Sequence, residues 1–139
     1  MSKVFIDTNI LIYSIDPDSI RHQEAVSILK SLVLQNKEKI ITPFVINEAH
    51  YFYIKTVGRE EARKIVEKIL DSPILKLVDL ELSVKDLKNI LKISHKYKLK
   101  TFDSFHAYYC KKLRIKNIAT FDPDFKKISW IEIFEDKSN

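Results

Sequence analysis

The sequence predicts an α/β fold, a three-layer sandwich in which helices flank a mostly parallel central sheet of about five strands. Two observations favour this class. Short apolar, β-branched runs recur along the chain, and longer stretches with helical period separate them. Strands that alternate with helices are joined by crossover connections, which pair them in parallel. The chain has 139 residues, the size of one domain, and we expect a single domain over residues 1–139.

The expected strands are short apolar runs rich in β-branched residues. A strand that helices cover on both faces needs such a continuous run, because neither face meets water. The runs are Val4–Ile6, Ile40–Thr42, Leu75–Val78, Asn117–Thr120 and Trp130–Phe134.

Helices are expected where apolar side chains recur with a period of about 3.6 residues. The clearest case is the stripe through Val66 and Ile69, which would face the core from a helix over residues 59–71. Similar stripes predict helices over residues 19–36 and 84–97.

Residues that favour helix ends support these assignments. Ser83, with Asp86 three residues later, predicts an N-terminal capping box for the helix that follows. Thr42 and Pro43 predict the N-cap and the first position of another helix, which would end before Gly58, the only glycine.

The composition favours a polyanionic partner and argues against several kinds of site. The formal net charge is +5, and basic residues are densest between Lys92 and Lys116. Cys110 is the only cysteine, so an intrachain disulfide and a cysteine-based zinc site are excluded. The four histidines lack the i, i+4 spacing of a helical zinc site, and we do not expect a histidine-based metal centre.

The sequence also bears on where the protein works. No apolar run approaches the roughly 20 residues that span a bilayer, and the first residues lead straight into a strand rather than a signal peptide. We therefore expect a cytoplasmic protein with no membrane association.

Two carboxylates lie just beyond expected strands. Asp7 comes directly after Val4–Ile6, and Asp122 comes one residue after Asn117–Thr120. Open α/β sheets place ligands outside the carboxyl ends of their strands, and these two strands would end at the same edge. Alternatively, Asp7 caps a helix, and Asp122 forms a turn with Pro123.

Two further carboxylates belong to expected helices. Glu48 lies on the apolar face of the helix that starts at Pro43, with Val45 and Phe52 as neighbours one turn away. A charge in that position needs a compensating cation or a basic side chain. Asp103 lies at the start of a helix that continues through Tyr109, where capping is the competing explanation.

These residues give the chain a resemblance to PIN-domain nucleases, and in particular to the VapC-like toxins of toxin–antitoxin pairs. The resemblance covers nearly the whole chain. It depends on Asp7-Thr8-Asn9, on Glu48 in the third helix, on Asp103-Ser104-Phe105-His106-Ala107, and on Thr120-Phe121-Asp122-Pro123-Asp124-Phe125.

The resemblance implies a metal-dependent endoribonuclease. Asp7, Glu48, Asp103 and Asp122 would bind Mg²⁺ or Mn²⁺ and cleave RNA. Hard oxygen ligands favour these ions over zinc. We favour Asp122 over Asp124 as the last ligand and keep Asp124 as a ligand through water.

The resemblance further implies supporting residues and partners. Thr8, Asn9 and Thr120 would hold the carboxylates or a metal-bound water. A homodimer and a cognate antitoxin protein are expected alongside the RNA substrate. As a hypothesis, the basic stretch from Lys92 to Lys116, helped by Arg21 or His22, guides the phosphate backbone toward the acidic residues.

Three other functions compete with a toxin. A stand-alone RNA-processing nuclease of the same fold would share every motif. A catalytically silent RNA-binding or protein-binding module should have lost at least one acidic position, and all four are filled here. A phosphatase of the haloacid-dehalogenase class would need a second Asp two residues after Asp7, where Asn9 stands.

Overall fold

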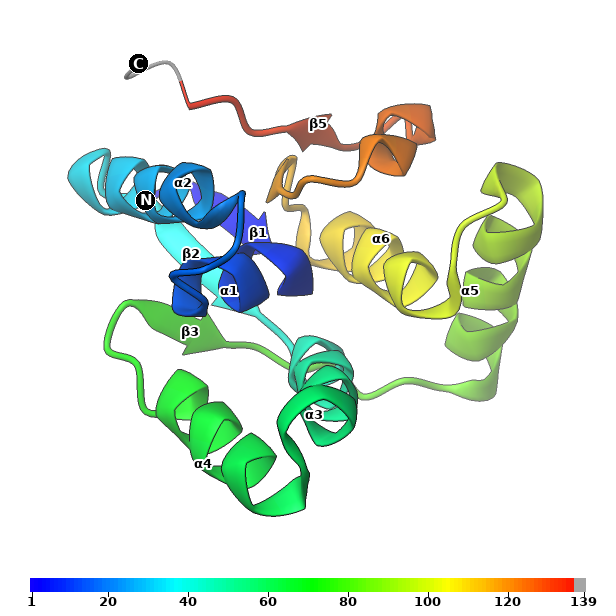
Figure 1. Ribbon diagram of the computed structural model, residues 1–139. Coiled ribbons are helices and arrows are strands. Elements are labelled where there is room, and N and C mark those ends of the chain that lie inside the picture. Colours follow the sequence, from blue (N-terminus) through cyan, green and yellow to red (C-terminus); the bar gives the residue numbers. More distant parts are fainter. Residues whose placement is uncertain (137–139) are drawn as a thin grey trace.

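The structure, a computed structural model that describes residues 1–136, is built on a five-stranded sheet in the order β3-β2-β1-β4-β5 (Figure 1). All neighbouring strands pair in parallel, with β1 in the centre. The predicted fold class is confirmed, and the strand positions agree except at their ends. The strands are β1 (Lys3–Ile6), β2 (Glu38–Ile41), β3 (Leu75–Leu77), β4 (Asn117–Ala119) and β5 (Glu132–Ile133).

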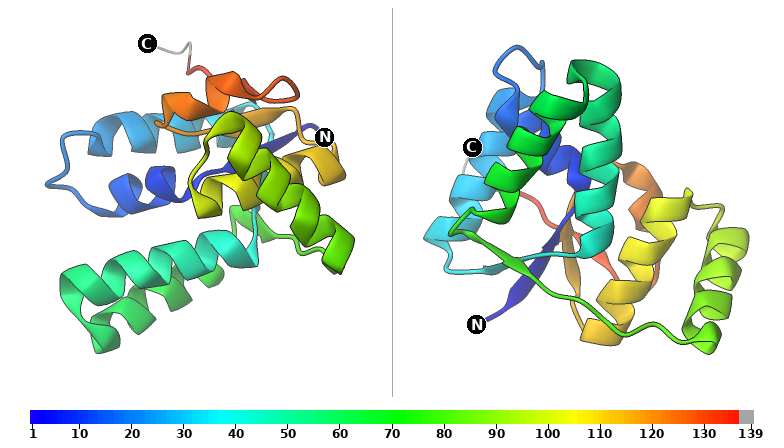
Figure 2. Two further views of the ribbon diagram at one scale, coloured as in Figure 1. Left: turned by 90° about the vertical axis from the view of Figure 1, so that its right-hand side faces the viewer. Right: turned by 90° about the horizontal axis from the view of Figure 1, so that it is seen from below.

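Helices cover both faces of this sheet. Figure 2 shows α1, α2 and α4 on one side and α5 and α6 on the other, which confirms the three layers. The helices are α1 (Thr8–Ile15), α2 (His22–Leu34), α3 (Pro43–Val57), α4 (Arg59–Leu70), α5 (Val84–Tyr97), α6 (Thr101–Leu113) and the 3-10 helix η1 (Pro123–Lys127).

The helix ends follow the local signals in the sequence. Thr42 caps α3 by accepting a hydrogen bond from the amide of Val45, and Ser83 and Asp86 form the predicted capping box of α5. Gly58 closes α3 at a φ of 86°, a value that glycine adopts without steric cost. The helix expected from residue 19 begins at His22 instead, because Ser19 holds a turn: its hydroxyl accepts from the amide of Arg21 and its carbonyl from the amide of His22.

The two central strands lie at the heart of the core. Phe5 and Ile6 of β1 and Ile118 of β4 are completely buried, and Phe125 and Tyr109 pack beside them. Each such side chain contributes roughly 1.5–3 kcal/mol on burial. Burial on both faces is the reason why these strands are continuous apolar runs.

The chain leaves β1 and β4 in opposite directions. From β1 it passes through α1 and α2 to β2, whereas from β4 it passes through η1 to β5 on the other side. Such a divergence opens a crevice at the carboxyl ends of the two strands, where α/β proteins bind ligands. Asp7 and Thr120, the residues that follow β1 and β4, lie at this crevice.

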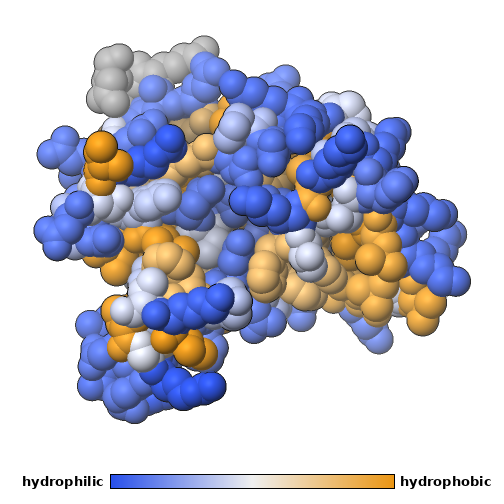
Figure 3. Space-filling view, turned by 45° about the vertical axis from the view of Figure 1, so that its right-hand side comes forward, coloured by the Kyte–Doolittle hydropathy of each residue, from blue (hydrophilic) through white to orange (hydrophobic). Residues whose placement is uncertain are grey.

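The surface carries exposed apolar side chains on α5. Val84, Leu87 and Leu91 form an outward strip on this helix, with 70%, 43% and 69% exposure, and Figure 3 shows the apolar patch on this part of the molecule. Among the described residues, no helix combines the length and the apolar character that crossing a bilayer requires.

Candidate functional site

Asp7 is fixed at the end of β1 by hydrogen bonds to both carboxylate oxygens. Oδ1 accepts from the amide of Thr8 at 2.7 Å, and Oδ2 accepts from the hydroxyl of Thr120 at 2.6 Å. The backbone amide of Asp7 donates to the carbonyl of Ala119 at 2.9 Å, which ties the ends of β1 and β4 together. Asp7 does cap α1, but the cap uses only one oxygen, and the side chain is buried.

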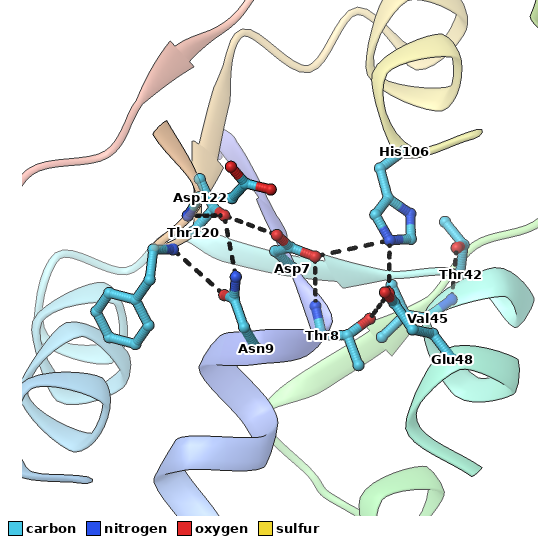
Figure 4. Close-up of polar contacts among 10 residues, drawn as sticks. Asp7, Thr8, Asn9, Thr42, Val45, Glu48, His106, Thr120 and Asp122 are labelled. Carbon is cyan, nitrogen blue, oxygen red and sulfur yellow. Dashed lines mark hydrogen bonds and ion pairs between the residues drawn. The ribbon is translucent and has the colours of Figure 1, made fainter. Parts of the chain in front are cut away.

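Glu48 projects from α3 toward Asp7 and meets a histidine. Its Oε1 accepts from the hydroxyl of Thr8 at 2.5 Å and lies 3.1 Å from Nε2 of His106, which is also 3.6 Å from Oδ1 of Asp7. Figure 4 shows these side chains pointing toward one another. The expected compensating partner of Glu48 therefore exists, and it is an imidazole rather than a lysine or an arginine.

Asp103 and Asp122 complete the group. Asp103 lies in the first turn of α6, is buried, and lies close enough to Asp122 for the two carboxylates to act on each other. It does not cap the helix, since the N-cap is Lys100 without any side-chain bond, so the capping explanation for Asp103 is wrong. Asp122 follows β4 and caps η1 by accepting from the amide of Asp124 at 2.9 Å.

The polar residues expected to support the carboxylates connect the same elements. The hydroxyl of Thr120 donates to Asp7 and accepts from the amide of Asp122 at 2.9 Å. Asn9 donates to the same hydroxyl at 3.4 Å and accepts from the amide of Phe121 at 3.3 Å. These contacts, drawn in Figure 4, fix the spacing between the loop after β1 and the loop after β4.

We call Asp7, Glu48, Asp103, His106 and Asp122 the acidic cluster. Suitable ligand atoms of Asp7, Asp103 and His106 lie within 4.8 Å of one another. Carboxylates at about 5 Å repel one another by about 3 kcal/mol per pair at an effective dielectric of about 20. One imidazole cannot neutralise four carboxylates, so the cluster fits a divalent cation, for which carboxylate oxygens are preferred ligands.

Burial and repulsion make the cluster hold protons when no cation is bound. Burial raises the pKa of Asp103, and the charges of Asp7 and Asp122 add to the effect, so that this pKa reaches about 7. The pKa of Asp7 is raised by burial, although the charge of His106 and the hydrogen bond from Thr120 oppose the rise. A cation entering the cluster must therefore displace protons.

His106 stands in one of the motifs that carry the family resemblance, but no role of its own was predicted for it from the sequence. Burial alone would lower its pKa, but the hydrogen bond to Glu48 and the charges of Asp7 and Glu48 outweigh burial, and the pKa is raised. For Glu48, burial is likewise outweighed by His106, and its pKa is lowered. The available signal was spacing: His106 comes three residues after Asp103, on the same face of α6.

Asp124 adjoins the acidic cluster through its backbone, because its amide donates to Oδ1 of Asp122 at 2.9 Å. Its side chain is 37% exposed and forms an ion pair with Lys127 at 3.3 Å. The side chain that reaches Asp103 belongs to Asp122.

Arg21 and His22 were expected to help guide the phosphate backbone. The guanidinium of Arg21 lies 4.7 Å from the ring centre of Phe121, the residue that precedes Asp122. Nδ1 of His22 lies 3.0 Å from the carbonyl oxygen of Tyr13. Arg21 is therefore the one that neighbours the acidic cluster through Phe121.

Comparison with known proteins finds the same family along nearly the whole chain. The family described as PIN domain matches residues 4–131. Two proteins of Methanocaldococcus jannaschii are similar in sequence. Ribonuclease VapC2 is 33% identical, over 96% of this chain and 94% of its own. Ribonuclease VapC6 is 30% identical, over 97% of this chain and 98% of its own.

Solved structures show the same fold at lower sequence identity. VapC20 of Mycobacterium tuberculosis, described as a toxin that cleaves the sarcin-ricin loop, superposes with a TM-score of 0.72 at 18% identity, over 95% of this chain and 99% of its own. DNA-bound VapBC from Salmonella typhimurium gives a TM-score of 0.71 at 19% identity, over 96% of this chain and 98% of the matched chain.

Proposed function

The chain belongs to the PIN-domain family, and from this premise we propose that it is a metal-dependent endoribonuclease, the toxin of a toxin–antitoxin pair. The observation that carries the proposal is the convergence of Asp7, Glu48, Asp103 and Asp122 from four separate elements at one edge of the sheet. RNA as the substrate is supported by the two relatives named ribonuclease.

Carboxylate oxygens of Asp7, Glu48, Asp103 and Asp122 would hold Mg²⁺ or Mn²⁺. The chemistry that such an ion would supply is activation of water for attack on the phosphodiester and neutralisation of charge on the leaving oxygen. The exposed Asp124 would at most act on the ion through water. This assignment gives every member of the acidic cluster except His106 a direct contact with the ion.

The remaining residues would keep the carboxylates in place. Oε1 of Glu48 is already engaged by Thr8 and His106, so Glu48 would offer its other oxygen to the ion. Thr120 holds Oδ2 of Asp7 and positions Asp122 through its amide. Ligands oriented in this way avoid the cost of reorganisation when the ion binds.

No side chain is needed as a nucleophile. Burial raises the pKa of the Cys110 thiol, so it stays protonated and unreactive. His106 is completely buried, and its Nε2 lies between two carboxylates, both of which can only accept hydrogen bonds when ionised. Nε2 of His106 therefore donates a hydrogen bond to Glu48. We assign His106 as a positioning residue and not as a base.

An antitoxin partner and a homodimer are part of the proposal. The antitoxin partner is supported by solved structures of similar fold that are described as VapBC or toxin–antitoxin complexes. The homodimer follows from the family resemblance alone. Induced expression should arrest growth, and co-expression of the neighbouring open reading frame should restore it. Growth unaffected by the active protein would favour a stand-alone RNA-processing nuclease instead.

The direct test is cleavage of structured RNAs with Mg²⁺, with Mn²⁺ or with a chelator. We expect metal-dependent cleavage by the wild type and none by Asp7→Asn or Asp103→Asn. Asp124→Asn is the matched control, because it removes one carboxylate outside the cluster and should remain active. Cleavage that survives the chelator would contradict the proposal. RNA binding without any cleavage would support the silent module.

A further inference from the structure

The basic stretch from Lys92 to Lys116 lines two adjoining cavities. Lysines from α5 and α6 line a cavity of about 420 Å³ together with aromatic side chains, and Arg114 and Lys116 line a second cavity that shares Lys111 and Trp130 with the first. We call the first cavity the lysine pocket. Its cationic and aromatic members are Lys92, Lys96, Lys111, Lys112, Tyr97, Tyr108 and Trp130.

Aromatic rings form one wall of the lysine pocket. Trp130, between η1 and β5, donates from its indole nitrogen to the carbonyl of Ala107 on α6 at 2.9 Å. The ring of Tyr97 meets it edge-on, with centroids 5.8 Å apart. Both rings are partly exposed, so a fixed aromatic surface faces the cavity.

Ammonium groups lie over these rings. Nζ of Lys111 is 4.7 Å from the ring centre of Trp130, and Nζ of Lys96 is 5.2 Å from that of Tyr97. Cations in this position gain modestly from the ring quadrupole and stay accessible to an anion. The pocket thus combines apolar ring surface with mobile positive charge.

The lysine pocket carries more positive charge than the acidic residues beside it can balance. No Asp or Glu lines it, and among residues 1–136 its four lysines form no ion pair, whereas Lys76 and Lys127 elsewhere do. Asp86, the acidic residue at the start of α5, accepts hydrogen bonds from Ser83 and from the hydroxyl of Tyr108, and its charge also acts on Lys112. Unpaired cations gathered around one cavity favour a ligand with several negative charges.

We propose that the lysine pocket is a second RNA-binding site, which takes an unpaired nucleotide of the substrate. The base would lie against the ring of Trp130, displacing the ammonium group of Lys111, and the flanking phosphates would meet Lys92, Lys96 and Lys112. A base in a duplex could not enter a cavity of this kind, whereas an unstacked base in a loop could. The choice of RNA as the nucleic acid depends on the proposed function.

The same helix joins the lysine pocket to the acidic cluster. Asp103 lies in the first turn of α6 and Lys111 in its last, about 12 Å apart along the helix axis. The acidic cluster repels the phosphate backbone, and the lysine pocket would supply the compensating attraction. Removal of the positive charges of the lysine pocket should therefore raise the KM for RNA cleavage and leave its kcat nearly unchanged.

The binding test uses Trp130, which is the only tryptophan and hence a specific reporter. The full chain, kept with a chelator so that RNA is not cleaved, is titrated with a single-stranded RNA. We expect saturable quenching of Trp130 that tracks binding measured by anisotropy. Binding without any change in the fluorescence of Trp130 would overturn the proposal. Equal quenching by inorganic polyphosphate or by polyglutamate would also overturn it, because the pocket would then recognise charge alone.

Charge-neutralising variants provide the second readout. Lys92→Gln, Lys96→Gln and Lys112→Gln together should reduce the slope of log affinity against log salt by about 2. The matched control replaces Lys30, Lys64 and Lys68, which are exposed on α2 and α4, and should leave the slope nearly unchanged. Equal effects of both triple variants would contradict a local site.

The two proposals can fail separately. Asp7→Asn should abolish cleavage and keep the quenching of Trp130. If the wild type cleaves RNA but Trp130 does not respond, only the lysine pocket is wrong. If Trp130 responds but no cleavage is found, only the nuclease assignment is wrong.

Discussion

The acidic cluster and the lysine pocket are both charged, but they are built differently. In the acidic cluster, Asp7 and Asp103 are buried, and hydrogen bonds fix the carboxylate of Asp7. In the lysine pocket, Lys92 and Lys112 are exposed, unpaired within the described residues, and carried by long flexible side chains. A buried carboxylate is held in one fixed position, so the loss of any one of them should abolish the function of the acidic cluster. Exposed lysines attract an anion by their summed charge, so the loss of one of them should have a small effect.

The largest difference between the two regions should follow from a single carboxylate. Asp103→Asn should weaken Mn²⁺ binding and slow cleavage by more than about 100-fold, because even outer partners of a metal site cost 10–100-fold. A single Lys92→Gln change should alter cleavage by less than about 3-fold, as expected for one exposed charge. Cleavage rates at saturating metal check both. Similar losses for the two variants would break the comparison.

Variants of His106 test whether a residue that is not itself a proposed metal ligand is needed to position the ligand Glu48. His106→Phe removes the donor to Glu48 and should weaken Mn²⁺ binding by about 10–100-fold. His106→Gln restores a donor and should recover part of that affinity. His95→Gln, exposed on α5, is the control and should bind like the wild type. If His106→Gln and His106→Phe bind Mn²⁺ equally, the hydrogen bond to Glu48 does not position it.

Metal binding by the acidic cluster should depend on pH, because one of its carboxylates holds a proton near neutral pH. Asp103 has a pKa of about 7 because of burial and the charges of Asp7 and Asp122, so protons compete with the ion below that pH. Affinity for Mn²⁺ should fall about tenfold from about pH 8 to about pH 6. Calorimetric titrations across this range measure it. A flat profile for the wild type would contradict a proton held by the cluster.

The smallest expected effect concerns stability without metal. The pKa of Asp103 is raised from 3.8 to about 7 by burial and nearby charges, so folding favours its protonated form, and stability falls as pH rises through that window. Asp103→Asn cannot ionise and should be more stable than the wild type at about pH 8, and this difference should shrink as the pH falls toward about 4. Urea unfolding at both values checks this, and a constant difference would count against it.

Much of the fold could be predicted because its signals are local. Thr42, Ser83 and Gly58 mark helix ends through contacts within a few residues, and they act as predicted. Asp7 and Asp122 could be placed at one sheet edge because parallel strands end together. Which residues act as metal ligands remains a prediction.

The features that escaped prediction arise where distant elements meet. The role of His106 depends on α6 approaching α3, which brings it to Glu48, and no local pattern encodes that approach. Trp130 was assigned to a strand, but β5 begins only at Glu132, and the indole packs on α6 instead. The lysine pocket therefore could not be recognised from the spacing of its lysines alone.

The proposed activity depends on a divalent ion that displaces protons from the acidic cluster. Calorimetric titration of Mn²⁺ at neutral pH, in two buffers with different ionisation enthalpies, measures binding and proton release together. We predict saturable binding with proton release for the wild type and for Asp124→Asn, and its loss in Asp7→Asn and Asp103→Asn. Undiminished binding by Asp7→Asn and Asp103→Asn would contradict it.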